Sequence, residues 1–439
     1  MNNDTIFALS SASGQAGVAV IRVSGDKVLT VYNKLTDKKN PKEKYLQCNY
    51  ILDEDKTPID QAMTVYFKSP KSFTGEDVLE IHCHGSRAVI GKILSILASI
   101  AGCRMAERGE FTRRAVYHNK MDLTAAEGLI DLIHADTEQQ RKWALRQMGG
   151  ELQKLYDSWR TILVQNRAYL EAFIDFPEEE IPPEKMKMIE QGIQELIFKI
   201  NTHLNDQNRG RILHEGYKIA IIGAPNVGKS SLLNYLSQKD AAIVSDVAGT
   251  TRDVVEVYMD IEGYPVLISD TAGLRDTDEV IEKEGIRRAL IKAEEADLLI
   301  ALGDAQKAPV LDSATKKALN THQNAVLVWN KCDTVNQKAK EEICISAKMG
   351  KGIDILQNII RENVIKTMSF NDSPMITRER YKELLKQCVE ALERFFKVPE
   401  IELKAEELRT ASTALGKITG AVSTEELLDI IFSTFCIGK

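Results

Sequence analysis

Apolar positions near the start of the 439-residue chain either alternate with polar ones or run without a break. Short stretches of this kind favour β-strands, whereas the longer pattern before residue 100 repeats with the period of a helix. We therefore expect an α+β domain over residues 1–118. Its expected strands are residues 6–9, 18–23, 64–67 and 78–82, and its expected helix is residues 88–100.

Helical periods dominate two further regions, one before and one after the middle of the chain. Apolar residues spaced three and four apart predict amphipathic helices that bury one stripe. Helices on the two sides need each other to bury these stripes, which favours one helical domain with an insertion; two separate small bundles are the alternative. The expected helices are residues 124–148, 152–170, 183–204, 381–395, 408–418 and 423–435, with capping boxes at Thr124-Ala-Ala-Glu127 and Ser423-Thr-Glu-Glu426.

The middle of the chain carries continuous apolar runs, typical of parallel strands with two buried faces. These runs are residues 217–222, 266–270, 325–329 and 343–345. We therefore predict a multidomain protein. It has an N-terminal α+β domain (1–118), a helical domain in two parts (119–215 and 371–439) and an inserted α/β domain (216–370).

The stretch Gly223-Ala-Pro-Asn-Val-Gly-Lys-Ser230 follows the first of these runs and precedes a helical pattern. In this context the glycines let backbone N–H groups face a phosphate at a helix N-terminus. Lys229 would reach the β- and γ-phosphates, and the Ser230 hydroxyl would bind Mg²⁺. The inserted domain is therefore predicted to be a P-loop domain that binds a nucleoside triphosphate.

Later motifs, each at the carboxyl end of an expected strand, specify guanine. Asp270-Thr-Ala-Gly273 can hold the Mg²⁺ shell and offer a backbone N–H to the γ-phosphate. In Asn330-Lys-Cys-Asp333 the final carboxylate can accept from N1–H and the exocyclic amine of guanine, a donor pair that adenine lacks. Such a site rejects the wrong base by about 10⁴–10⁵. Together with the loop Ser346-Ala-Lys348, these motifs predict a Ras-like GTPase.

The polar segment Ser245-Asp-Val-Ala-Gly-Thr-Thr-Arg-Asp253 is expected to be the switch loop. Thr251 is the candidate that closes on Mg²⁺ when a γ-phosphate is present, with Thr250 as its competitor. The expected nucleotide site comprises Asn226, Val227, Gly228, Lys229, Ser230, Ser231, Ser245, Asp246, Val247, Ala248, Gly249, Thr250, Thr251, Asp270, Thr271, Ala272, Gly273, Asn330, Lys331, Asp333, Ser346, Ala347 and Lys348.

Leu274 occupies the position where a Ras-like GTPase carries the glutamine that orients the attacking water. A leucine side chain cannot hydrogen-bond water, so another residue must take this role. Arg252 and Arg275 are candidates for the stabilising cation or are solvated surface charges, and a monovalent ion held by Asn226 and loop carbonyls is a third choice. The nearby acids are Asp276, Asp278, Glu279, Glu282 and Glu284.

Composition narrows the classes of partner. The 57 basic and 64 acidic side chains give a net charge of −7, which argues against an extended basic surface for nucleic acid. Seven scattered cysteines without a C-x-x-C spacing are expected to be reduced thiols of a cytoplasmic protein. A zinc site at His82-Cys83-His84 would need further ligands. Neither a membrane span nor a signal peptide is expected.

Charges interrupt two of the expected apolar strands, namely Arg22 in the second strand and Glu80 in the fourth. If each side chain points to solvent, the pattern is that of a strand with one wet face. If they share a face, they line a site for a polar small molecule. The period of the strands does not separate these two interpretations.

The chain also carries longer diagnostic stretches: Asp4-Thr-Ile6, Gly17-Val-Ala-Val-Ile-Arg-Val-Ser-Gly25, Ser72-Phe-Thr-Gly-Glu-Asp-Val-Leu-Glu80, Gly109-Glu-Phe-Thr-Arg-Arg114, Lys120-Met-Asp-Leu-Thr124 and Phe435-Cys-Ile-Gly-Lys439. With the switch motifs, they resemble the tRNA modification GTPases of the MnmE (TrmE) type over the whole chain. One departure lies around His84-Gly85, where Cys83 and Ser86 stand and the family often has more glycine.

The resemblance implies a homodimer joined through N-terminal domains that are similar to tetrahydrofolate-binding folds. It implies a formyl- or methylene-tetrahydrofolate beside Arg22, Glu80, Lys120 and Lys439. Cys436 is then either a nucleophile for the one-carbon unit or a buried tail thiol, and both interpretations stay open.

For the GTPase domain the resemblance implies potassium-stimulated hydrolysis with paired G domains. Potassium would bind Asn226, Ser245, Val247 and Thr250, magnesium would bind Ser230 and Thr251, and Glu282 would orient water. The implied partner is a FAD-dependent protein of the MnmG/GidA type in a heterotetramer. Together they would install a (carboxymethyl)aminomethyl group at C5 of the wobble uridine of certain tRNAs.

Two other classes of protein compete with this one. A ribosome-assembly GTPase often carries a KH domain with a GXXG loop. The stretch Gly416-Lys-Ile-Thr-Gly420 has the wrong spacing and lies in an expected helix. A nucleotide-gated scaffold at a membrane would need a lipidation box or a basic amphipathic helix, and neither is recognised.

Overall fold

In the computed structural model the chain forms two compact units. Unit 1 comprises Met1–Ile130, Gln147–Glu180 and Lys397–Lys439, and unit 2 comprises Asp131–Arg146 and Ile181–Phe396. The described residues are 4–176, 182–206, 208–239, 256–270, 290–335, 343–368, 374–422 and 425–438.

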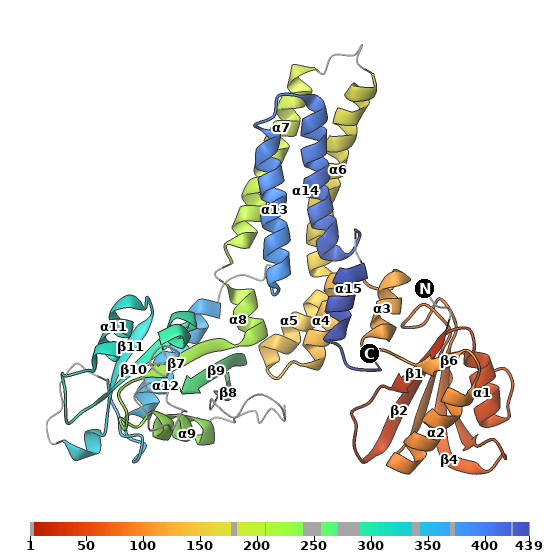
Figure 1. Ribbon diagram of the computed structural model, residues 1–439, viewed down its shortest axis with the longest axis horizontal. Helices are drawn as coiled ribbons and strands as arrows, with labels where there is room; N and C mark the ends of the chain where they lie inside the picture. Colours follow the sequence, from red (N-terminus) through yellow and green to blue (C-terminus); the bar gives the residue numbers. More distant parts are fainter. Residues whose placement is uncertain are drawn as a thin grey trace. The chain divides into compact units, whose positions relative to one another are not determined.

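Unit 1 begins with a six-stranded sheet of order β3-β4-β5-β2-β1-β6 (Figure 1). Neighbouring strands are antiparallel, except that β1 and β6 run parallel. All four strands expected here are present, whereas β3 and β6 were not expected. The strands are β1 (Thr5–Leu9), β2 (Ala16–Ser24), β3 (Gln47–Leu52), β4 (Pro58–Phe67), β5 (Val78–Gly85) and β6 (Cys103–Met105).

Both faces of this sheet are covered. On one face Ala19, Ile21 and Val23 of β2 pack against α1 (Val28–Thr36) and α2 (Arg87–Ser99). On the other face Ile6 and Ala8 of β1 pack against Phe111 of α3 (Glu110–Tyr117). Because side chains alternate along β2, Arg22 lies on the face that α3 covers.

The remaining helices of unit 1 are α4 (Leu123–Ile133), α6 (Glu151–Asp175), α14 (Ile401–Thr419) and α15 (Glu425–Ser433). The long helices α6 and α14 lie side by side although the inserted segment separates them in sequence (Figure 1). Leu123 and Ala126 of α4 similarly pack against Phe432 and Phe435 at the C-terminus. Helices before and after the insertion therefore bury their apolar stripes together, while the domain boundaries themselves stay a prediction.

One helical prediction is wrong in detail. The expected helix of residues 124–148 is two helices, α4 and α5 (Glu138–Met148). The carboxylate of Asp122 accepts from the backbone N–H groups of Thr124 (3.1 Å) and Ala125 (2.9 Å), so it caps α4 and places Thr124 inside the helix. Thr137 then accepts from the backbone N–H of Gln140 (3.4 Å) in the first turn of α5.

Unit 2 contains a second six-stranded sheet, of order β12-β11-β10-β7-β9-β8. All neighbours are parallel except β8 and β9. The strands are β7 (Tyr217–Ile222), β8 (Glu256–Ile261), β9 (Tyr264–Asp270), β10 (Leu298–Asp304), β11 (Ala325–Asn330) and β12 (Ile343–Cys344). The described helices between them are α9 (Lys229–Lys239), α11 (Ser313–Thr321) and the short 3₁₀ helix Cys332–Thr334, and α12 (Ile353–Met368) follows β12. This is the predicted α/β architecture.

Three helices flank this sheet in sequence: α7 (Pro183–Leu204), α8 (Arg209–Glu215) and α13 (Glu379–Phe395). Helix α7 packs along α13 (Figure 1). A Cβ atom on Gly210 of α8 would collide with the carbonyl oxygen of Ile376, so α8 and the segment before α13 touch through their backbones. The chain thus enters and leaves the inserted domain at neighbouring points.

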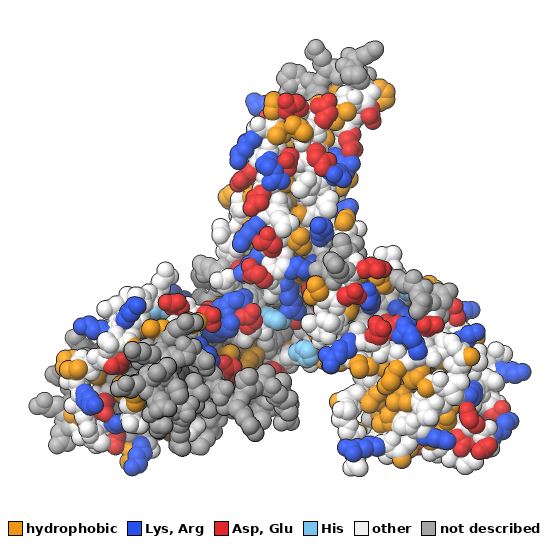
Figure 2. Space-filling model, viewed as in Figure 1, with side chains coloured by type: hydrophobic (Ala, Val, Ile, Leu, Met, Phe, Trp, Pro, Cys, Tyr) orange, Lys and Arg blue, Asp and Glu red, His pale blue; other side chains and the backbone are white. Residues whose placement is uncertain are grey.

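The surface agrees with the modest net charge. Figure 2 shows acidic and basic side chains of both signs interspersed along the visible face of the long helices. Among the described residues, no helix combines the length and the apolar character that crossing a membrane requires.

Candidate functional site

The loop between β7 and α9 has the backbone of a phosphate-binding turn. Asn226 and Gly228 both adopt positive φ angles, 62° and 101°. A Cβ atom on Gly228 would collide with the side chain of Asn330, so only glycine fits this approach. Helix α9 begins at Lys229, and its first N–H groups and positive dipole end therefore lie at the loop.

Lys229 brings a positive charge into this loop. Its ammonium group donates to the carbonyl oxygens of Gly223 (2.7 Å) and Ala224 (3.0 Å), and the residue is only 6% exposed. A buried cation and a helix N-terminus at one point make a site for an anionic phosphate.

The position of the loop in the sheet supports a ligand site. Strand β7 is central, and the chain places β8 and β9 on one side of it before returning to add β10 and β11 on the other. Open α/β sheets bind ligands at such a switch point, beyond the carboxyl ends of the strands. Asp304 is the last residue of β10 and Asn330 is the last residue of β11, and the two are register partners. Both therefore lie at this edge of the sheet.

Asn330 braces the phosphate loop to the base-recognition loop. Its side-chain amide donates to the carbonyl oxygen of Val227 (2.8 Å), and its side-chain oxygen accepts from the backbone N–H of Ala347 (3.0 Å). The residue is 3% exposed, so these hydrogen bonds satisfy a buried amide. The structure thereby brings the first and the last predicted motifs together through one side chain.

The two charged residues after Asn330 are also placed by specific contacts. Lys331 has a positive φ of 66°, and its ammonium group pairs with Asp304 at 2.7 Å. A hydrogen bond from Ser346 holds the pKa of the exposed Asp333 carboxyl below its ordinary value. Asp333 is therefore an ionised acceptor near neutral pH, as guanine recognition requires.

Much of the predicted phosphate and metal site lies outside the described residues. This applies to Arg252, Leu274, Arg275 and Glu282, and to the side chain of Asp270. It also applies to Ser245, Asp246, Val247, Ala248, Gly249, Thr250, Thr251, Thr271, Ala272, Gly273 and Lys439. The choice between Thr250 and Thr251 therefore stays open.

The cysteines differ from the sequence-based expectation. Cys332 and Cys344 form a disulfide, with Cα atoms 6.0 Å apart, whereas all seven cysteines were expected to be reduced. The spacing of the two residues gave no signal, because β11 and β12 bring them together only in the folded sheet. The other five cysteines are free thiols.

In unit 1, Arg22 and Glu80 lie opposite each other in the register of β2 and β5. The guanidinium group donates to Glu80 Oε1 from Nε (3.0 Å) and Nη2 (2.8 Å). It also lies over the rings of Phe73 (5.2 Å) and Phe111 (5.8 Å). The two charges thus share a partly covered face, with side chains 16% and 18% exposed, and neither points alone into solvent.

The C-terminal tail lies beside the same domain. Gly438 accepts a hydrogen bond from the Ser10 hydroxyl (2.9 Å), and the carbonyl oxygen of Cys436 accepts from Gly109 N–H (3.3 Å). Gly109 immediately precedes α3, whose Phe111 contacts Arg22. Helix α3 therefore links the tail to the charged pair. The Cys436 side chain is exposed, so the interpretation as a buried tail thiol is wrong.

Lys120 is also exposed, and its ammonium group donates to the carbonyl oxygen of Pro70 (2.7 Å). The two histidines of β5 are also paired: His84 lies 2.7 Å from Asp60, and His82 lies 3.4 Å from Glu80. Within the described part of the chain, no three side chains of His, Cys, Asp or Glu are arranged to hold a metal ion.

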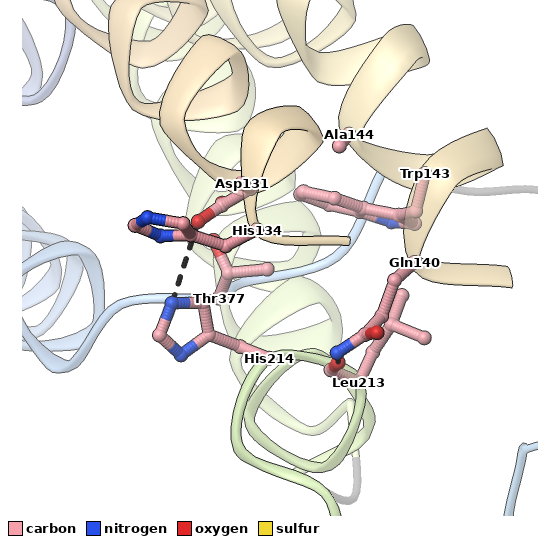
Figure 3. A pocket seen from close by; sticks show the side chains of 8 residues that line it. All are labelled: Asp131, His134, Gln140, Trp143, Ala144, Leu213, His214 and Thr377. Atoms are coloured by element: carbon pink, nitrogen blue, oxygen red, sulfur yellow. Dashed lines mark hydrogen bonds and ion pairs between the residues drawn. The ribbon is translucent and has the colours of Figure 1, made fainter. Parts of the chain in front are cut away.

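Sequence reasoning missed a polar cluster in unit 2 around a cavity of about 60 Å³. Gln140 donates to the carbonyl oxygen of Leu213 and the hydroxyl of Tyr258, both at 3.1 Å. Burial raises the pKa of Tyr258 to about 12. Gln140 thus joins α5, α8 and β8, the strand that follows the predicted switch loop. The lining residues, drawn in Figure 3, are Asp131, His134, Gln140, Trp143, Ala144, Leu213, His214 and Thr377.

An acidic side chain anchors the other end of this cluster. Asp131 Oδ1 accepts from Arg378 (2.5 Å) and lies 3.4 Å from His214 Nε2, the contact dashed in Figure 3. Asp131 Oδ2 and Thr377 Oγ1 are buried and have no hydrogen-bond partner within the described part of the protein. A polar cavity of this size accommodates ordered water. No periodicity or motif in the sequence marks these residues.

Two known protein families match this chain, and together they account for most of its length. The MnmE helical domain matches residues 123–436, and the N-terminus of the GTP-binding protein TrmE matches residues 5–120. The tRNA modification GTPase MnmE of Rickettsia akari is 45% identical over 450 residues, covering 99% of this chain and 100% of that protein. That of Parvibaculum lavamentivorans is 46% identical over 442 residues, with the same coverage.

Solved structures give a weaker likeness. The structure of Aquifex aeolicus Era bound to GDP and aluminium fluoride is 23% identical and covers 42% of this chain and 68% of its own. The G domain of the Thermotoga maritima iron transporter FeoB is 24% identical and covers 34% of this chain and 98% of its own. Their TM-scores of 0.27 and 0.26 are too low to carry an argument.

Proposed function

This chain belongs to the MnmE family of tRNA modification GTPases, and we propose that its GTP hydrolysis drives the modification of C5 of the wobble uridine in certain tRNAs. In the proposal, a tetrahydrofolate one-carbon unit contributes to a (carboxymethyl)aminomethyl group. A FAD-dependent partner of the MnmG/GidA type acts with the chain, in the cytoplasm and as a heterotetramer.

The side chain of Asn330 gives the main support for the GTP-binding part of the proposal. It ties Val227 of the phosphate loop to Ala347 of the base-recognition loop. Asp333, ionised and exposed, follows three residues after this brace. A phosphate site and a guanine acceptor held in fixed relation support recognition of the whole nucleotide.

The metal ligands of the proposal come from the same loop and from residues outside the described part. Ser230 and Thr251 would hold magnesium, and Asn226, Ser245, Val247 and Thr250 would hold potassium. The exposed side chain of Asn226, on a loop residue with positive φ, fits an oxygen ligand at the outer face of the loop. Potassium held there supplies the positive charge that an arginine finger supplies in other GTPases. Glu282 would orient the attacking water in place of Leu274.

In the proposal, the tetrahydrofolate binds on the face of the N-terminal sheet that α3 covers. Glu80 can accept from the amide edge of a pterin, and Arg22 and Lys120 can meet carbonyl or acidic groups of the folate. The half-buried Phe73 already lies against Arg22 and could stack on a planar ring. In the proposal Cys436, which is exposed, is the nucleophile, and Lys439 follows it three residues later in the sequence. In the proposal, a homodimer forms through the N-terminal domains.

Each half has its own test. GTP turnover in potassium and in sodium buffers should differ by at least about tenfold, and Glu282→Ala should remove most of that stimulation. Full turnover in Glu282→Ala would rule out its role.

Isothermal titration with a formyl-tetrahydrofolate should give saturable heat with the full-length protein. If it does not, while GDP binds normally, the folate site is wrong and the GTPase assignment stands.

A further inference from the structure

The disulfide joins the two loops that are assigned to the guanine base. Cys332 is the third residue of Asn330-Lys-Cys-Asp333, directly before the carboxylate assigned to the base. Cys344 ends β12, two residues before Ser346. The Cα–Cα separation of 6.0 Å lies in the ordinary range for bonded cysteines, so the backbone already accommodates the bond.

Hydrogen bonds hold the two loops in the same register. The backbone N–H of Cys332 donates to the carbonyl oxygen of Ile345 (3.0 Å), and that of Ile345 donates to Trp329 (2.8 Å). Asp333 and Ser346 then hydrogen-bond through their side chains. The covalent bond therefore joins the base-recognition loops within two residues of Asp333, Ile345 and Ser346.

The two cysteines are open to exchange. Both are half-buried, so a small thiol or disulfide can reach the pair without unfolding the sheet. The other five cysteines are free, including the exposed Cys48 and Cys436. A single disulfide among free thiols is the pattern of a redox-sensing pair in a reducing compartment rather than that of a disulfide scaffold.

We propose that Cys332 and Cys344 form a reversible disulfide that slows release of the guanine nucleotide, so that the redox state sets how long the nucleotide stays bound. The proposal rests on the assignment of Asp333 and Ser346 to the base. Release requires the loops that enclose the base to separate, and a covalent bond between them resists that separation.

The chemistry balances with a small-molecule disulfide of the glutathione class as oxidant. One cysteine thiolate attacks RS–SR, which forms a mixed disulfide and expels one RS⁻; the second cysteine thiolate then attacks the mixed disulfide and expels the other. The two protein thiols lose two protons and two electrons, and one RS–SR becomes two RSH. Excess thiol reverses both steps.

The test compares release of a fluorescent GDP analogue from the full-length protein in reduced and oxidised glutathione buffers. Alkylation and peptide mass analysis on the same samples report the state of each cysteine. We expect a Cys332–Cys344 peptide in the oxidised sample and release about threefold to tenfold slower than in the reduced sample. Cys332→Ser and Cys344→Ser should release the analogue at one rate in both buffers, and Cys48→Ser should keep the full difference.

Three results would overturn the proposal: no Cys332–Cys344 peptide under oxidising conditions, release rates that agree within the error of measurement, or an undiminished difference in Cys332→Ser. Binding of the GDP analogue by the reduced protein distinguishes failure of the base-site assignment from failure of the redox inference. If reduced protein does not bind the GDP analogue at all, the assignment of the base site fails. If it binds the analogue but releases it at the same rate in both redox states, only the redox inference fails.

Discussion

The base-recognition loops of unit 2 and the charged pair of unit 1 place acids beside buried strands in opposite ways. Asp333 follows a strand end, and its carboxylate is exposed next to Ser346. Glu80 lies within a strand, and the guanidinium group of Arg22 already occupies one of its oxygens. The first carboxylate is exposed, whereas the second is paired with a guanidinium group within the protein.

This difference determines which existing hydrogen bonds a ligand must replace at each site. The Asp333 carboxylate is exposed beside Ser346, so a ligand can reach it directly, and affinity and specificity follow from the ligand's own hydrogen bonds. A ligand at Glu80 must share or replace the hydrogen bonds from Arg22, so stability and binding are coupled there. The comparison predicts that substitution of Asp333 changes ligand choice, whereas substitution of Arg22 also changes stability.

The largest effect is expected from Asp333→Asn. Loss of the carboxylate should reduce the preference for guanine over adenine nucleotides by about 10⁴-fold. The new amide can donate to the C2 carbonyl of xanthine, so affinity for xanthosine diphosphate should rise. Competition of GDP, ADP and xanthosine diphosphate against a fluorescent nucleotide measures both changes. Retained guanine preference would remove Asp333 from the base site.

A smaller effect is expected when the brace is removed. Asn330→Ala leaves the buried groups of Val227 and Ala347 without partners and should lower the free energy of unfolding by about 3 kcal/mol. Trp329 fluorescence during denaturant unfolding measures this change in a Trp143→Phe, Trp159→Phe background. The exposed Asn234→Ala is the matched control and should stay within about 0.5 kcal/mol. Equal unfolding of both variants would contradict the brace.

The charged pair gives a two-part prediction. Arg22→Met leaves Glu80 partly buried without its guanidinium partner and should destabilise β2 and β5 by about 2 kcal/mol. Adding Glu80→Leu should restore most of this stability without restoring binding of a formyl-tetrahydrofolate. Hydrogen exchange of β2 and β5 peptides and titration calorimetry measure the two effects. Folate binding by the double variant would make the pair purely structural.

The smallest effect concerns pH. Burial opposes ionisation of Glu110, but hydrogen bonds from Arg104, the Glu107 backbone and Arg114 outweigh it and hold its pKa below the ordinary value. The unfolded chain then takes up the proton first as the pH falls, so this carboxylate stabilises the fold above the unfolded pKa and loses that contribution in more acidic solution. Between pH 5 and pH 3, unit 1 should lose about 1 kcal/mol through this group.

Hydrogen exchange of α3 at both pH values tests this, with Glu110→Gln as the variant that should lack this part of the pH dependence. Because the pKa of Asp333 is lowered by its hydrogen bond with Ser346, its protonation should weaken GDP binding only in more acidic solution, without a matching change in α3. Identical pH profiles for Glu110→Gln and the unchanged protein would contradict the assignment.

The sequence predicted four of the six strands described in unit 2, because the motifs there follow continuous apolar runs; β8 and β10 were not expected. It predicted the long helices and their pairing because the stripes are wide and regular. It placed the cap of α4 wrongly because Asp122 and Thr124 are both good caps and only the backbone geometry separates them. Gln140 and the Cys332–Cys344 bond were missed because their partners are distant in sequence and carry no periodic signal.

The same reason explains the undecided charges of unit 1. The two-residue period places Arg22 and Glu80 on faces of their own strands, but only the register of β2 with β5 shows that they meet. The covering rings of Phe73 and Phe111 come from a loop and a helix that the period of the strands does not describe. A shared face is a tertiary property, whereas a motif at a strand end is a local one.

The central claim is that two separate sites, one for GTP and one for a folate, serve one tRNA modification. The most direct test quantifies modified wobble uridine in tRNA from a strain lacking this chain, complemented with the unchanged protein, with Asp333→Asn or with Arg22→Met/Glu80→Leu. The account predicts full modification with the unchanged protein and loss of modification with each variant. Full modification supported by the double variant of the charged pair would contradict it.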